Sequence, residues 1–133
     1  MDEIYQEKIL EHYKNPKNNK LLILPTHSAR EANHVCGDII EIHLREENGT
    51  IVETGFKGKG CALSIASASI ITEYIKGKTK EQIQSLQKDD MTELLNSQVP
   101  KSREECITLS LRAIKNAINK SNERGTTKYK GDN

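Results

Sequence analysis

Residues 57–71 read KGKGCALSIASASII, and this stretch decides how the rest of the chain can be arranged. Gly58 and Gly60 allow backbone angles that a side chain would forbid, so the chain can turn sharply before Cys61. The residues that follow are small or apolar nearly all round, which predicts a central, buried helix over residues 62–76. Cys61 would lie at the start of this helix, where the positive end of the helix dipole favours a thiolate.

The segment before this helix predicts an antiparallel meander. Residues 39–45 alternate apolar and polar side chains, which is typical of a half-buried strand. Residues 47–50 contain an Asn-Gly turn, and residues 51–56 return as the partner strand. A further edge strand is expected near residues 26–32.

The segment after the central helix predicts more helices. Gly77 is expected to cap the central helix, and Ser102 is expected to start the last one through a capping box with Glu105. Helices are predicted over residues 3–14, 79 to about 87, 90–95 and from about 103. This order predicts an α+β domain in which helices pack on one face of a small three-stranded antiparallel sheet.

The length and composition predict a single domain over residues 1–121, followed by a polar tail over residues 122–133. The 133 residues carry a net charge of +1, with acidic and basic residues interspersed. This pattern argues against nucleic-acid and membrane-surface partners. We see no secretory signal and expect a cytoplasmic protein.

The three cysteines carry the chemical argument. Cys36 is followed by Gly37 and Asp38, while Cys61 and Cys106 are both expected at helix starts. If the two helices pack side by side, three thiols and one carboxylate could meet, which suits tetrahedral zinc or the irons of a cluster. The alternative is that the helical cysteines are ordinary core residues, because cysteine is often buried. The residues alone leave both interpretations open.

Ser64, Ser67 and Ser69 are interpreted as small residues that allow close helix packing. The four histidines, His12, His27, His34 and His43, are interpreted as structural or solvated. His34 is the exception to consider, because it lies two residues before Cys36.

Several motifs in order resemble the U-type iron–sulfur assembly proteins, the family of IscU, SufU and the N-terminal domain of NifU. The resemblance covers residues 3 to about 120. Its markers are EHYKNPKN at 11–18, CGD at 36–38, GKGC at 58–61, SIASAS at 64–69, TE at 72–73, GKT at 77–79 and Cys106.

This resemblance implies a SufE/IscU-like fold and a metal or cluster site formed by Cys36, Asp38, Cys61 and Cys106. It implies a transient [2Fe–2S] cluster built from iron, with apo iron–sulfur proteins or carriers as recipients. It also implies a cysteine desulfurase partner that delivers sulfur to Cys36, with Cys106 as the alternative acceptor. Asp38 would be the exchangeable ligand, because a hard carboxylate among thiolates is held less firmly.

The chain departs from the family pattern in several places. Glu105 stands where IscU-like members have histidine, and Arg103 matches an arginine of SufU-like members, where it is a candidate for partner binding. The SufU-like insertion between the second and third cysteines is absent. Residues 98–102 differ from the IscU-like chaperone-recognition segment, so a dedicated chaperone is not expected. His34 replaces a proline, and His34 and Glu105 remain open as local donors.

Three hypotheses follow. The first is a scaffold on which a [2Fe–2S] cluster is assembled and then transferred. The second is a zinc-containing sulfur-transfer protein whose persulfide is a covalent intermediate, which would make it almost an enzyme. The third is a zinc-stabilised interaction domain without sulfur chemistry. We favour iron–sulfur assembly.

Overall fold

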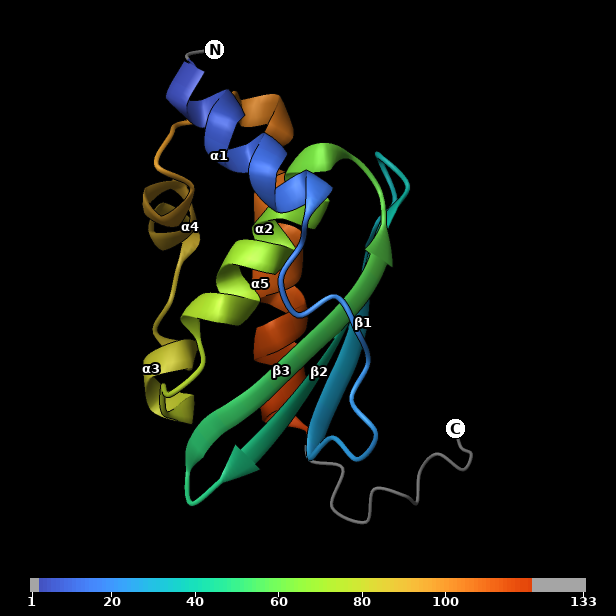
Figure 1. Cartoon of the computed structure of the whole chain (residues 1–133), viewed down its shortest axis with the longest axis vertical. Helices are drawn as coiled ribbons and strands as arrows, with labels where there is room; N and C mark the ends of the chain where they lie inside the picture. The colour runs from blue at the N-terminus through green and yellow to red at the C-terminus, as the bar shows by residue number, and fades with distance from the viewer. Residues whose placement is uncertain (1–2, 121–133) are drawn as a thin grey trace.

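The computed structural model describes residues 3–120, so the predicted tail at 122–133 lies outside the described residues. The elements in chain order are α1 (Glu3–Lys14), β1 (His27–Asn33), β2 (Asp38–Glu47), β3 (Thr50–Lys59), α2 (Ala62–Tyr74), α3 (Lys80–Gln84), α4 (Lys88–Leu95), a 3₁₀ turn η1 (Lys101–Arg103) and α5 (Glu104–Asn119). The predicted α+β class is confirmed (Figure 1). No helix within the described residues is long and apolar enough to cross a membrane.

The sheet is the predicted meander, with strand order β1-β2-β3 and both pairs antiparallel. Ile40, Ile42 and Leu44 on β2 are fully buried, as their alternation predicted. Asn48 and Gly49 both have positive φ angles, +53° and +83°, which is the backbone that tight hairpin turns of this kind require. The register set by the turn shifts by one residue at a bulge between Arg45 and Glu46, beyond which Ile42 faces Phe56 across the β2–β3 pair.

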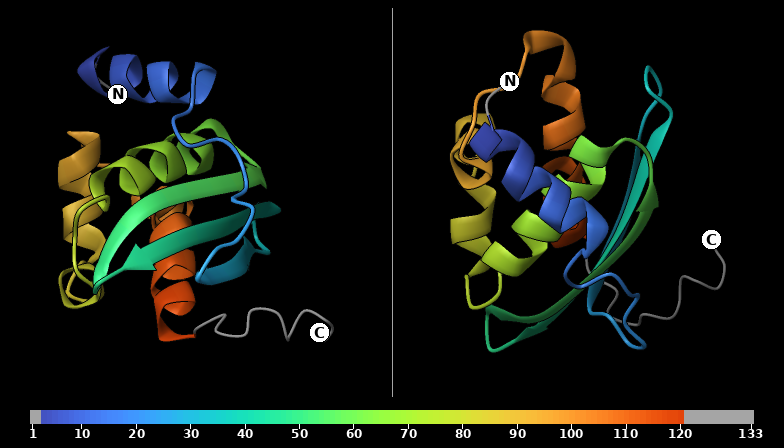
Figure 2. Two further views of the ribbon diagram at one scale, coloured as in Figure 1. Left: turned by 60° about the horizontal axis from the view of Figure 1, so that its bottom comes forward. Right: turned by 45° about the horizontal axis from the view of Figure 1, so that its top comes forward.

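The helices lie on one side of the sheet (Figures 1 and 2). α5 packs against β1 and β2, while α2 packs against β3 and against α5. Most of α2 is buried, as its uniform composition predicted, and α1 and α4 cover it from the side away from the sheet. These contacts place the starts of α2 and α5 beside each other, at the end of the sheet where β3 finishes.

Two predicted caps differ from the structure. Ser102 does not cap α5: it lies inside η1, where the Arg103 N–H bonds to the Pro100 carbonyl at 2.8 Å, so the helix begins only at Glu104. Gly77 lies beyond the end of α2, whose C-cap residue is Ile75. The Gly77 N–H donates to the Ile51 carbonyl of β3 at 2.7 Å, so the positive φ of Gly77 turns the chain back toward the sheet.

The short helices begin and end differently from the prediction. Thr79 does cap α3 through a reciprocal capping box with Gln82. α3 ends at Gln84 rather than near residue 87, and a second box between Gln87 and Asp90 starts α4 at Lys88. The amide side chain of Gln87 at the N-cap position gave no recognised helix-start signal in the sequence.

Candidate metal centre

Three separate parts of the chain meet at one end of the sheet. The turn between β1 and β2 holds Cys36 and leads into Asp38, the first residue of β2. Cys61 is the N-cap residue of α2, and Cys106 lies in the first turn of α5. In Figure 1 the β1–β2 turn, the end of β3 and the start of α5 are all found at the upper end of the molecule.

The ligand atoms of Cys36, Asp38 and Cys106 all lie within 4.8 Å of one another. Within the part of the chain that the structure describes, this is the only group of three or more His, Cys, Asp or Glu side chains so close together. Asp38 and Cys106 are each 1% exposed, whereas Cys36 is exposed. The group is therefore closed toward the core and open toward solvent on the side of the β1–β2 turn.

Cys61 lies outside this group of three but adjoins it. Its Sγ is 3.6 Å from Asp38 Oδ2, and its backbone N–H donates to Asp38 Oδ1 at 3.1 Å. The side chain of Cys61 makes no capping hydrogen bond of its own. Asp38, from β2, thus satisfies a backbone donor at the start of α2 and places its negative charge at the positive end of the helix dipole.

Ser64 is a component of the site that sequence reasoning missed. Its hydroxyl donates to Asp38 Oδ2 at 2.6 Å and lies 3.3 Å from the Cys106 carbonyl oxygen. The interpretation of Ser64 as a small packing residue is therefore incomplete, because the buried side chain also makes a hydrogen bond within the site. The available signal was its position three residues after Cys61, which puts both on one face at the start of the helix.

The pKa values of the two helical cysteines are shifted in opposite directions. Burial raises the pKa of Cys61, but polar contacts of its sulfur with the Ser64 backbone and hydroxyl, with Arg103 and with Cys106 outweigh burial and lower that pKa overall. Burial raises the pKa of Cys106 to about 11, and the nearby Cys61 thiolate adds to the effect against the attraction of Arg103. Hydrogen bonds to both sulfurs raise the pKa of Arg103. The arrangement therefore favours the thiolate at Cys61 and disfavours it at Cys106, beside the Arg103 guanidinium.

The remaining sequence candidates are not brought into the group. His34 and Glu105 are both exposed, and neither belongs to the group of close ligand atoms. His12 Nδ1 instead lies 2.7 Å from the Ser69 hydroxyl, between α1 and α2. Ser69 therefore also has a hydrogen-bonding role in addition to its small size.

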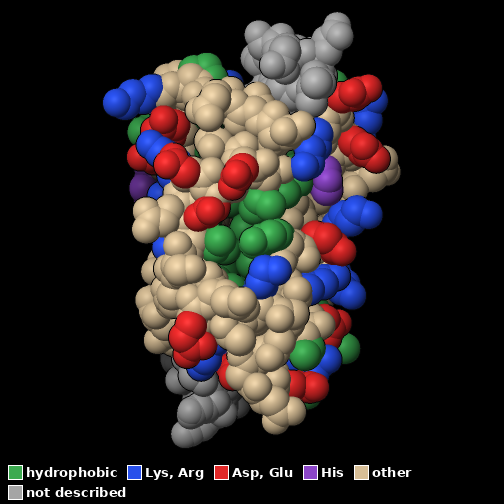
Figure 3. All heavy atoms as spheres, turned by 90° about the vertical axis from the view of Figure 1, so that its left-hand side faces the viewer, with side chains coloured by type: hydrophobic (Ala, Val, Ile, Leu, Met, Phe, Trp, Pro, Cys, Tyr) green, Lys and Arg blue, Asp and Glu red, His purple; other side chains and the backbone are tan. Residues whose placement is uncertain are grey.

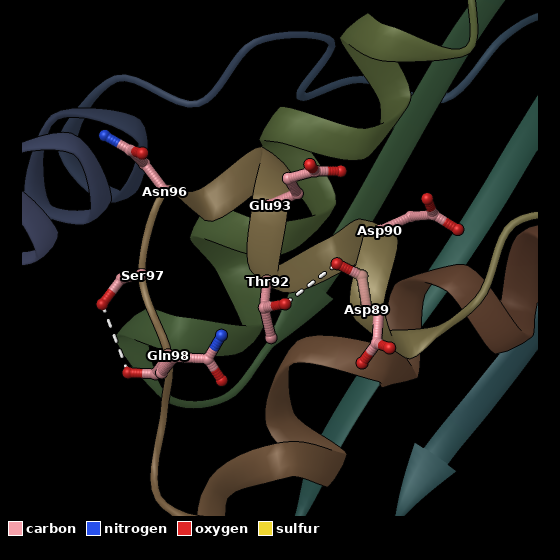
Figure 4. Close-up of a pocket in the computed structure, with 7 residues that line it drawn as sticks. All are labelled: Asp89, Asp90, Thr92, Glu93, Asn96, Ser97 and Gln98. Carbon is pink, nitrogen blue, oxygen red and sulfur yellow. Dashed lines mark hydrogen bonds between the residues drawn. The ribbon is translucent and has the colours of Figure 1, made fainter.

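The rest of the surface offers two further features. Seen from the side of α3 and α4, apolar side chains gather in the middle of the face and charged side chains of both signs surround them (Figure 3). A shallow hollow beside α4 is lined by Asp89, Asp90, Thr92, Glu93, Asn96, Ser97 and Gln98. Its carboxylates point in different directions (Figure 4). The hydroxyl of Thr92 donates to the Asp89 carbonyl, and the hydroxyl of Ser97 donates to the Gln98 carbonyl. The hollow therefore lacks convergent ligands.

The thiol and carboxylate donors suit a borderline or soft metal. Thiolates bind zinc and the irons of iron–sulfur clusters, and one carboxylate oxygen can complete such a set. The protein supplies a buried floor of Asp38 and Cys106 and an exposed Cys36 at the entrance. Such a site is accessible from solvent through Cys36.

Comparison with known proteins gives a consistent result. A family model described as "NifU-like N terminal domain" matches residues 4–128. The chain is 32% identical to the iron–sulfur cluster assembly scaffold protein IscU 1 of Archaeoglobus fulgidus, over 86% of this chain and 74% of that protein. It is 33% identical to the scaffold protein IscU of Haemophilus influenzae, over 86% of this chain and 92% of that protein.

A solved structure gives the same fold. The N-terminal NifU-like protein of Brucella abortus superposes with a TM-score of 0.73 at 24% identity, covering 87% of this chain and 92% of that one. At this identity, the likeness concerns the fold alone.

Proposed function

This chain belongs to the family of NifU-like N-terminal domains, and from that premise we propose that it is a scaffold for iron–sulfur cluster assembly. The cluster is its cargo rather than a resident cofactor. The relatives named as IscU scaffold proteins match over most of their own length, which supports transfer of this function to the chain.

The convergence of Cys36, Asp38 and Cys106 within 4.8 Å is the observation that carries the proposal. Adding Cys61, which lies against Asp38, gives three sulfurs and one oxygen, the donor set that the resemblance implies. The proposal assigns all four residues to holding iron and the nascent [2Fe–2S] cluster. Zinc suits the same donors and would occupy the same site.

Cys36 is the proposed sulfur acceptor, because it is the exposed thiol of the group. A cysteine desulfurase is the proposed donor, carrying a persulfide on its own cysteine. The Cys36 thiolate attacks the outer sulfur, a new S–S bond forms at Cys36, and the desulfurase cysteine leaves as a thiolate. Each transferred sulfur then requires two electrons from an external donor to become cluster sulfide.

The sulfur-transfer alternative predicts the same formation of a Cys36 persulfide but a different fate for the sulfur. In that case zinc would remain in the site while the Cys36 persulfide passes on to another protein. The relatives reported above carry scaffold names, which supports the first function over the alternative. Arg103 is a candidate for partner binding, and its interaction with the sulfurs of Cys61 and Cys106, which raises its pKa, also supports a role within the site.

The test is metal and sulfide analysis of untagged protein before and after anaerobic incubation with desulfurase, cysteine, ferrous iron and a reductant. We expect iron and sulfide to appear in equal amounts, with visible cluster absorption and loss of any bound zinc. A Cys106→Ser variant is the control and should fail to retain the cluster. Retained zinc without cluster absorption would favour sulfur transfer, and absence of both metals would overturn a metal-based function.

A further inference from the structure

Ser64 is the point where three elements of the site meet. It lies in the first turn of α2 and is 1% exposed. Its hydroxyl is 2.6 Å from Asp38 Oδ2 on β2, 3.3 Å from the Cys106 carbonyl on α5 and 3.7 Å from Cys61 Sγ. A hydroxyl has one proton to donate, and the short distance to a carboxylate identifies Asp38 as its acceptor.

The Asp38 carboxylate is held by α2 at both of its oxygens. The Cys61 N–H bonds to Oδ1 at 3.1 Å and the Ser64 hydroxyl bonds to Oδ2 at 2.6 Å. A carboxylate has about four lone-pair directions, so these two bonds leave others free for a metal. The ligand atoms of Cys36 and Cys106 are already within 4.8 Å of the carboxylate while both bonds are made. The hydrogen bonds and metal ligation are therefore geometrically compatible.

We propose that Ser64 is a positioning residue for metal binding: it does not touch the metal, but it fixes the orientation of Asp38 toward Cys36 and Cys106. This inference rests on the proposed function, because it presumes that Asp38 ligates the metal. Partners that orient a metal ligand typically contribute about 10- to 100-fold in metal affinity. Without the Ser64 hydroxyl, Oδ2 would lose its closest donor in a buried position, and the carboxylate would be free to turn away.

The chain contains a matched control on the same helix. Ser67 lies one turn further along α2 and is fully buried, and its hydroxyl has no hydrogen-bond partner among the described residues. Removing the Ser67 hydroxyl therefore changes the same chemical group in the same helix without touching the site. Ser64→Ala removes the contacts with Asp38, Cys61 and the Cys106 carbonyl, whereas Ser67→Ala removes none.

The experiment is a titration of the metal-free protein with Co²⁺, followed by its thiolate charge-transfer absorption, and a competition titration with Zn²⁺. We expect Ser64→Ala to raise the dissociation constants for Co²⁺ and Zn²⁺ by about 10-fold or more. Ser67→Ala should change them by less than about 2-fold. Thermal unfolding of both metal-free variants establishes that each is folded at the titration temperature.

A double-mutant cycle with Asp38→Ala tests the route of the effect. If Ser64 acts through Asp38, Ser64→Ala should add less than about 2-fold in the Asp38→Ala background. An equal loss in both backgrounds would mean that Ser64 acts through Cys61 or the α5 backbone, and would overturn the inference. Unchanged affinity of Ser64→Ala beside tight binding by the wild type would overturn it as well. Failure of the wild-type protein to bind Co²⁺ at all would instead overturn the metal site of the proposed function.

Discussion

The backbone of Gly60 lies directly against the carboxylate of Asp38. A Cβ atom at position 60 would be 2.4 Å from Asp38 Oδ1 and 2.6 Å from its Cγ, and the φ angle of Gly60 is +154°. The loop before α2 therefore needs glycine for the approach to the site carboxylate as well as for the turn. The Gly60 backbone thus lies beside Asp38 Oδ1, the same oxygen that accepts the Cys61 N–H.

Gly60→Ala should displace Asp38 and weaken Co²⁺ binding by about 10-fold or more, the scale expected when the support of a ligand is lost. The measurement is the titration described for Ser64. Gly49→Ala is the matched control: its φ is +83°, but nothing lies within 4 Å of an added Cβ, and it sits in the β2–β3 turn. Gly49→Ala should cost about 1 kcal/mol in unfolding free energy without altering metal affinity. Equal Co²⁺ affinity in the two variants would contradict the role of the Gly60 contact.

Asp38→Ala should have opposite effects on a single bound metal and on an assembled cluster. Removing a ligand weakens Co²⁺ binding, whereas removing the hard, exchangeable ligand of a thiolate-held cluster should lengthen the cluster's lifetime. The metal-free variant should lose about 1–3 kcal/mol in unfolding free energy, because the Cys61 N–H and the Ser64 hydroxyl lose a charged acceptor.

The lifetime of the Asp38→Ala cluster is measured from the decay of its visible absorption under a fixed chelator concentration. Asp89→Ala, an exposed acidic residue on α4, is the control and should decay like the wild type. Faster cluster loss in Asp38→Ala than in the control would show that the carboxylate protects the cluster rather than making it exchangeable.

Cys36→Ala should abolish the stimulation of a cysteine desulfurase by this protein. Cys36 is exposed, whereas Cys106 is 1% exposed and burial raises its pKa to about 11, so Cys106 offers little thiolate at neutral pH. The rate of alanine formation from cysteine reports the stimulation, and a mass shift of one sulfur atom reports the persulfide. Retained stimulation and a persulfide on Cys106 in this variant would transfer the acceptor role to Cys106.

Local patterns predicted the framework of the site. Alternation in residues 39–45 and the Asn48-Gly49 turn predicted the β2–β3 pair, and the uniform composition after Cys61 predicted a buried α2. These features depend on neighbouring residues, which a sequence displays directly. The positions of the cysteines at element boundaries follow from the same patterns.

Features that depend on distant partners were not predictable in this way. Ser64 bonds to a residue 26 positions earlier, and Gly77 donates to Ile51 across the helix–sheet boundary. Ser102 matched a capping pattern, but the 3₁₀ turn after Pro100 moved the helix start beyond it. In each case the role of the residue depends on a contact with another part of the chain or on the turn before it, whereas its local sequence pattern predicted a different role.

His27 should make the stability of the protein fall as the pH decreases through about 6.5, the ordinary pKa of histidine. Its side chain is almost fully buried at the start of β1; burial lowers its pKa and Lys80 adds to this, while Glu46, 3.6 Å away, opposes it. Because the folded state binds this proton less readily than the unfolded state, the contribution of His27 is complete above about pH 6.5 and is lost as the pH falls toward its folded-state pKa.

His27→Gln should therefore differ most from the wild type at about pH 7.5 and least at about pH 5.5 in chemical denaturation of the metal-free protein. His34→Gln, on the exposed β1–β2 turn, is the control for loss of a histidine as such. If the difference in unfolding free energy between the wild type and His27→Gln stays constant over this pH range, the folded state does not favour neutral His27 over the protonated form.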